Sequence, residues 1–72
     1  MDRTMVEQHF VENARHIVEG EKRIARQREL IAMFLRGGHD TADAVALLAT
    51  MEFTQRLHVE TRQHIVEELR TG

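Results

Sequence analysis

The chain of 72 residues contains no cysteine, proline, serine, tryptophan or tyrosine. Without cysteine it forms neither a disulfide nor a thiolate zinc site, and without serine or cysteine it lacks two of the commonest catalytic nucleophiles. No apolar run approaches the roughly 20 residues that cross a bilayer, and the N-terminus lacks the layout of a signal peptide. These absences predict a cytoplasmic protein that is not an enzyme and binds no cofactor.

Strong helix formers make up most of the chain: Ala, Leu, Glu, Arg and Gln dominate the composition. The formal net charge is −2, whereas a nucleic-acid-binding surface is usually clearly basic. One basic stripe exists, but Glu19 interrupts it. Nucleic-acid binding is therefore a minor alternative. The stripe consists of Arg15, Lys22 and Arg26.

The only strong break in the helical pattern is the central segment Gly37-Gly38-His39-Asp40-Thr41. A glycine can end one helix in the left-handed conformation, and Asp40 or Thr41 can cap the next. The pattern predicts a single domain over residues 1–72, with a helix over about 3–36, a turn over 37–40 and a second helix over about 41–70. The first helix has an apolar stripe of Val6, Phe10, Ala14, Ile17, Ile24, Ile31, Ala32 and Leu35.

The second helix has an apolar face of Ala44, Leu48, Met51, Val59, Ile65, Val66 and Leu69. Because the turn is short, the two helices are expected to run antiparallel as an all-α hairpin, packed like a coiled coil. A lone hairpin of this size cannot bury its own apolar surface. The sequence therefore predicts a homodimer in which two hairpins form a four-helix bundle with twofold symmetry.

Polar residues interrupt the apolar faces near the middle of the hairpin. Folding at the glycines places Ile17 near Arg62, Glu21 opposite His58 and Arg62, and Arg28 opposite Glu52 and Gln55. These residues are expected to form an interface layer that sets the register, as polar core residues do in coiled coils. The alternative is a partly open seam in which the side chains reach water. The predicted layer is Glu21, Arg28, Gln55, His58 and Arg62.

Several apolar residues point away from the predicted seam, and exposed apolar clusters commonly mark interfaces. We expect them to be buried against a second copy of the chain or against another protein. Scattered surface residues are the simpler alternative, but that reading does not explain the whole set. The predicted apolar interface is Leu30, Phe34, Phe53 and Leu57, with Met33 beside it.

Five histidines suggest two kinds of chemistry. Pairs such as Glu60 and His64 could supply metal ligands, but solvated histidines are the simpler interpretation. The segment from His16 to Gly20 resembles the phosphoacceptor region of histidine phosphotransfer domains, in which the glycine admits a response regulator. That resemblance implies a signalling protein phosphorylated on His16. The segment departs from the family at Glu19, where the family has a lysine.

A wider resemblance covers nearly the whole chain. The segments 16–21, 24–29, 47–50 and 55–58, together with the hinge Gly38-His39-Asp40-Thr41, resemble a group of short, functionally uncharacterised bacterial helical-hairpin proteins. The resemblance implies a recurrent hairpin and no activity. The sequence thus predicts a small interaction or regulatory module that acts as a dimeric bundle. Phosphotransfer through His16 is the alternative.

Overall fold

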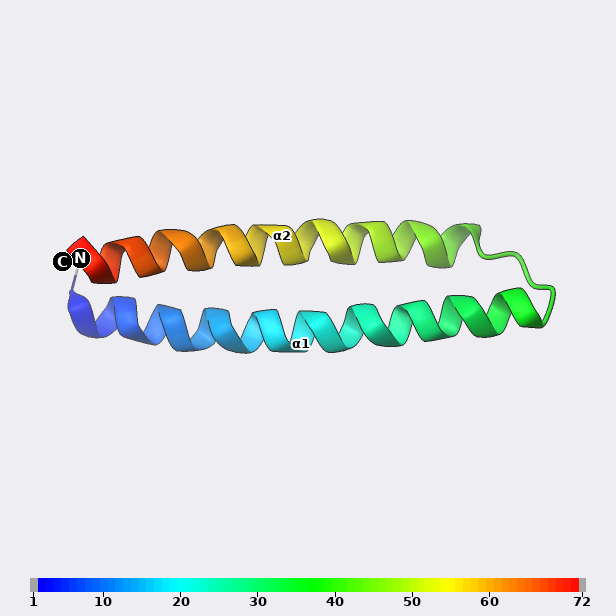
Figure 1. Ribbon diagram of the computed structural model, residues 1–72, viewed down its shortest axis with the longest axis horizontal. Coiled ribbons are helices and arrows are strands. Elements are labelled where there is room, and N and C mark those ends of the chain that lie inside the picture. Colours follow the sequence, from blue (N-terminus) through cyan, green and yellow to red (C-terminus); the bar gives the residue numbers. More distant parts are fainter. Residues whose placement is uncertain (1, 72) are drawn as a thin grey trace.

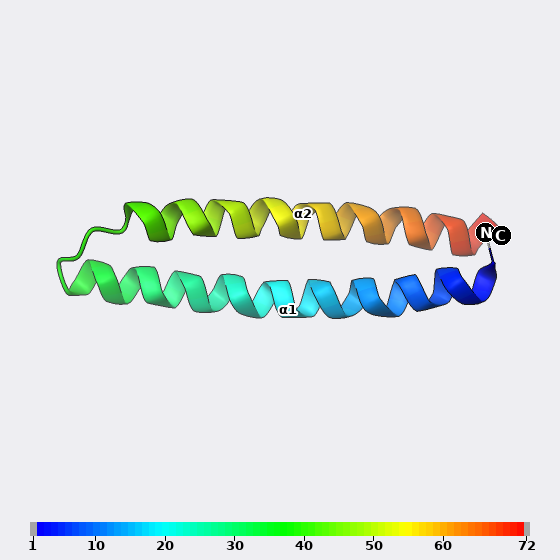
Figure 2. The ribbon, with the colours of Figure 1, turned by 180° about the vertical axis from the view of Figure 1, so that it is seen from behind.

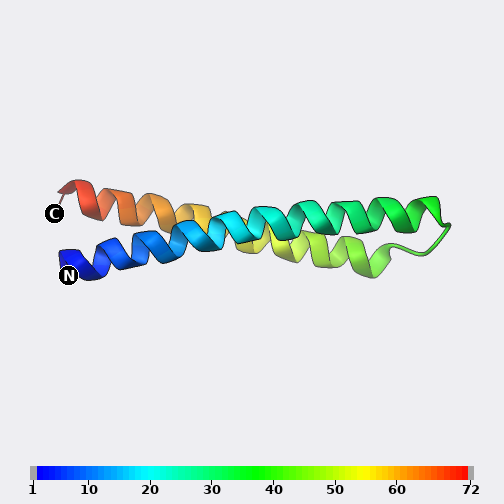
Figure 3. The same ribbon diagram turned by 90° about the horizontal axis from the view of Figure 1, so that it is seen from below.

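The computed structural model describes residues 2–71 and is all-helical, as the sequence predicts. Helix α1 (Arg3–Arg36) and helix α2 (Ala42–Thr71) lie antiparallel against each other and form a hairpin (Figure 1). The hairpin measures 54 × 14 × 13 Å, and the view from behind shows the same two helices side by side (Figure 2). Seen from below, the helices cross at a shallow angle near their middles (Figure 3). Neither described helix is both long enough and apolar enough to span a membrane.

The hinge has the chemistry that its sequence predicts. Gly38 has the left-handed conformation that ends α1, with φ of +75°. The Oδ1 atom of Asp40 accepts a hydrogen bond of 2.9 Å from the backbone amide of Ala42 at the start of α2. The linker then runs back alongside the end of α1, so α1 extends beyond the start of α2 (Figure 1).

This overhang shifts the register by about two helical turns from the predicted one. Gln55, not Arg62, lies beside Ile17, because its Nε2 atom donates a 2.8 Å hydrogen bond to the Ile17 carbonyl oxygen. Leu35, predicted to continue the apolar stripe, is 62% exposed since it lies past the start of α2. The sequence-based register was wrong because it assumed that the chain reverses without running back along α1.

The buried core is small and lies on α1. Val6, Ile17 and Ile24 are its buried apolar side chains, and no residue of α2 is fully buried. Phe10, placed in the predicted stripe, is 36% exposed. The predicted apolar face of α2 does lie toward α1, but each of its side chains is only half-buried. That face comprises Ala44, Leu48, Met51, Val59, Ile65, Val66 and Leu69.

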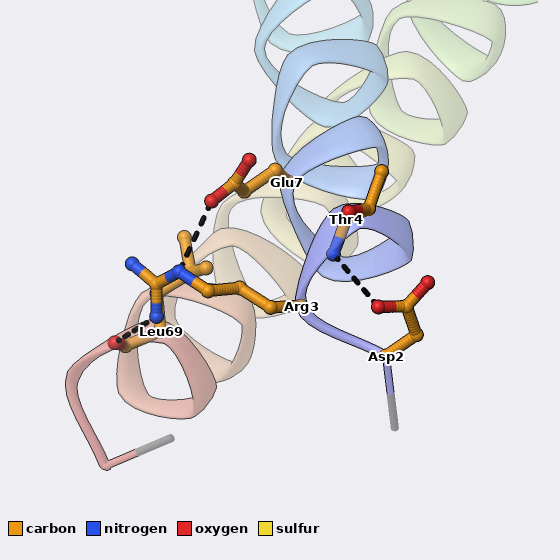
Figure 4. A network of polar contacts seen from close by, with 5 residues as sticks. All are labelled: Asp2, Arg3, Thr4, Glu7 and Leu69. Atoms are coloured by element: carbon orange, nitrogen blue, oxygen red, sulfur yellow. Dashed lines mark hydrogen bonds and ion pairs between the residues drawn. The ribbon is translucent and has the colours of Figure 1, made fainter.

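Polar contacts join the two helices at the end opposite the hinge (Figure 4). Arg3 forms a 3.1 Å ion pair with Glu7 and also donates a 3.4 Å hydrogen bond to the Leu69 carbonyl oxygen at the end of α2. The Oδ1 atom of Asp2 accepts from the Thr4 amide at 3.3 Å and caps α1. The arginine thus neutralises part of the negative end of the α2 dipole.

Candidate functional site

Three amide side chains form the polar part of the seam between the helices. Each donates a hydrogen bond to a backbone carbonyl of the opposite helix: Asn13 to His58 at 3.0 Å, Gln27 to Ala44 at 2.9 Å, and Gln55 to Ile17 at 2.8 Å. Asn13 and Gln27 are buried and Gln55 is half-buried. We call Asn13, Gln27 and Gln55 the amide seam. Because buried amides are costly without partners, these bonds favour the register that satisfies them.

Gly20 gives Gln55 its place in this seam. Asn13, Gly20 and Gln27 are spaced by seven residues, so all three face α2. A Cβ atom on Gly20 would overlap the amide oxygen of Gln55. The sequence left open whether this glycine marks a close approach or is simply tolerated. The structure shows a close approach, and the approaching group is a side chain of the same hairpin.

The predicted polar layer is only partly assembled. Arg28 forms its expected cross-helix ion pair with Glu52 at 3.0 Å, and Gln55 and His58 lie in the seam. Glu21 and Arg62 are exposed and form no ion pair within residues 2–71. The change of register by about two turns separates them. The sequence reasoning also missed Asn13 and Gln27, although their seven-residue spacing with Gly20 was a usable signal.

A pair of histidines lies at one edge of the seam. The rings of His16 and His58 stack with centroids 5.2 Å apart and planes inclined by 30°. Next to them is an open cavity of about 200 Å³, which Gly20, Arg23 and Thr54 also line. The Nδ1 atom of His58 and the Oδ1 atom of Asn13 are buried without a hydrogen-bond partner. We call this side of the hairpin the histidine edge.

The arrangement at the histidine edge bears on both chemistries considered from the sequence. Stacked imidazoles do not converge on one point, and residues 2–71 contain no group of three His, Asp or Glu side chains placed to hold a metal ion. Gly20 faces Gln55 inside the hairpin, so its absence of a side chain has a structural role there. Phosphotransfer through His16 stays a prediction, without the steric argument that the glycine offered.

The residues of the predicted apolar interface lie largely in solvent. Phe34, Phe53 and Leu57 are exposed and Leu30 is half-buried. The Phe53 ring is approached by the guanidinium of Arg56, whose Cζ atom lies 5.8 Å from the ring centroid. Phe34 contacts the His39 ring edge-on, with centroids 6.1 Å apart. These side chains are thus accessible for a contact with another molecule.

No protein-family model, curated protein or solved structure matches this chain. The resemblance to the bacterial hairpin group therefore stays a prediction, and the functional argument depends on the geometry of the hairpin itself.

Proposed function

We propose that this protein is a small, non-enzymatic interaction or regulatory module that acts as a homodimeric four-helix bundle. The observation that carries this proposal is the surface area of the single hairpin, which is 5650 Å². A compact folded monomer of 8.4 kDa exposes about 4600 Å². The hairpin thus exposes about 1000 Å² more than a compact monomer would, which is close to what one partner buries in a stable protein–protein interface.

The distribution of apolar side chains supports the same proposal. Large apolar residues on both helices remain half exposed, among them Val18 and Val45, which are 50% and 49% exposed. A helix that has apolar residues beyond its seam is typical of bundles in which each helix has two neighbours. A second hairpin would supply that neighbour for both helices.

The predicted apolar interface offers a further contact surface. Leu30, Phe34, Phe53 and Leu57 also expose apolar atoms to solvent. Aromatic side chains are enriched at protein interfaces. We propose that a protein partner other than the second copy covers this set in the assembled module.

Sedimentation equilibrium of the full chain over a micromolar concentration range tests the proposal. We expect a mass of twice the 8.4 kDa monomer, which falls toward the monomer mass when dilution dissociates the dimer. A folded 8.4 kDa monomer throughout this range would overturn the proposal. Labelling with a phosphorylated response regulator tests the phosphotransfer alternative, which requires phosphate on His16.

A further inference from the structure

The two long edges of the hairpin differ in chemistry, and two contacts identify them. The His16–His58 stack marks the histidine edge, and the Arg28–Glu52 ion pair marks the opposite one. Residues spaced by seven along a helix in such a pair share an edge. Val45, Val59 and Val66 are spaced in this way from Glu52, and Glu21 is spaced in this way from Arg28.

The edge that contains the ion pair is lined by valine and alanine on α1 and by valine on α2. On α1, a column with seven-residue spacing lies beside the column of Glu21 and Arg28, because its members are three or four residues away from them. Together with the α2 valines, this column forms what we call the valine edge. The valine edge consists of Val11, Val18, Ala25 and Ala32 of α1 and Val45, Val59 and Val66 of α2.

We infer that the valine edge is the surface on which a second copy of this chain docks, with α1 of one copy facing α2 of the other. This inference rests on the proposed dimer and identifies its interface. The valine edge runs along most of the 54 Å length of the hairpin, and a second copy has the same length. Alanine and valine also let helices approach closely along that length.

The amount of exposed surface and the charges of the valine edge both suit a second copy. One docked hairpin would cover the area of about 1000 Å² by which each chain exceeds a compact monomer. The oppositely charged Arg28 and Glu52 already neutralise each other across the edge. The histidine edge differs, since polar and charged side chains line its two adjoining cavities, among them Arg23 and Glu12.

Charge complementarity selects the orientation of the second copy. Because Gln55 lies beside Ile17 and the helices are antiparallel, Glu21 and Arg56 are about 7.5 Å apart in height along the hairpin. Helical side chains tilt toward the N-terminus of their helix, so these two side chains tilt toward each other's level. When the twofold axis is parallel to the long axis of the hairpin, a residue and its symmetry mate have the same height along that axis. The α1 helix of one copy then lies against α2 of the second copy. Arg56 of the second copy is then the basic residue of its α2 nearest in height to Glu21, and Val18 lies within about 8 Å in height of its Val59.

The alternative arrangement has its twofold axis perpendicular to the hairpin, places α1 against α1 and lacks this complementarity. The two hairpins then point in opposite directions. Because Glu21 is near the middle of α1, this arrangement would bring the two Glu21 carboxylates together. Like charges placed directly opposite each other disfavour an interface. The first orientation is therefore the one that the charges favour.

Substitution of matched exposed residues on the two sides of the hairpin tests which edge forms the dimer. Val18 and Leu57 are 50% and 45% exposed, and Leu57 belongs to the predicted apolar interface outside the valine edge. We expect Val18→Glu to raise the dimer Kd at least about 30-fold, because a carboxylate would be buried without a partner, and Leu57→Glu to leave it unchanged. Glutamate is a good helix former, so the hairpin itself should persist.

The outcomes separate the edge assignment from the proposed function. A dimeric parent chain that stays dimeric with Val18→Glu but dissociates with Leu57→Glu overturns the valine edge and leaves the dimer intact. A parent chain that is monomeric overturns both. Circular dichroism of each variant checks that a loss of mass reflects dissociation and not unfolding.

A charge exchange tests the orientation. Glu21→Arg should weaken the dimer about tenfold, because each substitution occurs twice across the twofold axis. Combining it with Arg56→Glu should restore the parent Kd, since the pair is reformed with its charges exchanged. A double variant that dimerises as weakly as Glu21→Arg alone would overturn the orientation.

Discussion

Helices α1 and α2 have similar lengths, 34 and 30 residues, but only α1 has buried side chains. The difference lies in how deeply each helix buries the residues that face its neighbour. On α1 five residues of the stripe are buried: Val6, Asn13, Ile17, Ile24 and Gln27. On α2 the residues that face α1, such as Leu48, Met51 and Ile65, are at most half-buried.

Both helices also have adjacent half-buried residues, such as Leu30 with Ile31 on α1 and Ile65 with Val66 on α2. Adjacent residues on a helix point about 100° apart, so a face that includes such pairs is too wide for one neighbouring helix to cover. The stripe of α1 nonetheless contains buried residues, whereas the facing residues of α2 are left half-covered along the helix, so α1 is the better covered of the two. The half-covered side of α2 includes the valines of the valine edge.

Truncating apolar residues at the same level on the two helices should give the largest contrast. We expect Ile24→Ala on α1 to lower the free energy of unfolding by about 2–4 kcal/mol, because the side chain is buried and leaves a cavity. Leu48→Ala on α2 should lower it by less than half as much if α2 is covered only by α1. Chemical denaturation at one fixed protein concentration measures both.

The monomeric background sharpens this comparison. In the Val18→Glu variant, the loss of unfolding free energy caused by Leu48→Ala comes from contacts within the hairpin alone. In the parent chain the same loss also includes any contacts made in the dimer. Equal losses for Ile24→Ala and Leu48→Ala in the monomeric background would contradict the asymmetry between the two helices. A larger loss for Leu48→Ala in the parent chain than in the monomer would show that dimerisation completes the cover of α2.

The contact between Gly20 and Gln55 predicts a change of sign. Gly20→Ala should destabilise the parent by up to about 1 kcal/mol, because the new methyl group displaces the Gln55 amide from its hydrogen bond to the Ile17 carbonyl oxygen. In a Gln55→Ala background the same substitution should stabilise by up to about 1 kcal/mol, because alanine favours a helix more than glycine does. Thermal denaturation of the parent, the two single variants and the double variant gives a double-mutant cycle. Destabilisation of equal size in both backgrounds would mean that Gln55 does not occupy this space.

The hinge and the helix bounds were predictable because their signals are local. Two glycines followed by Asp40 determine where α1 ends and α2 begins, and both effects act within a few residues. The register depends instead on the path of the linker, which runs back beside α1. No residue pattern in the five-residue hinge signals that path, and a change of about two turns placed Gln55 beside Ile17 in place of Arg62.

The polar seam was predictable in kind but not in its members. Charged residues near the apolar stripes drew attention to Glu21 and Arg62, yet long charged side chains at a seam margin can reach water. The side chains of Asn13 and Gln27 are shorter and uncharged. Their amide groups can therefore be buried when they donate a hydrogen bond to a backbone carbonyl oxygen across the seam. Their seven-residue spacing with Gly20 signalled this, because all three face the same neighbour.

The Arg28–Glu52 ion pair should have the smallest effect on the hairpin and the most informative dependence on assembly. Its side chains are 62% and 40% exposed, so solvent screening limits their coupling in the monomer to about 0.5 kcal/mol. A double-mutant cycle with Arg28→Gln and Glu52→Gln in the monomeric Val18→Glu background measures that value.

Because the pair lies on the valine edge, a second copy would exclude water from it. The same cycle in the dimeric parent should therefore give a larger coupling energy that is less sensitive to salt. An identical, equally salt-sensitive coupling in both backgrounds would place the pair in water in the dimer as well. The second copy would then lie elsewhere, and the half-covered face of α2 would be left for a different partner.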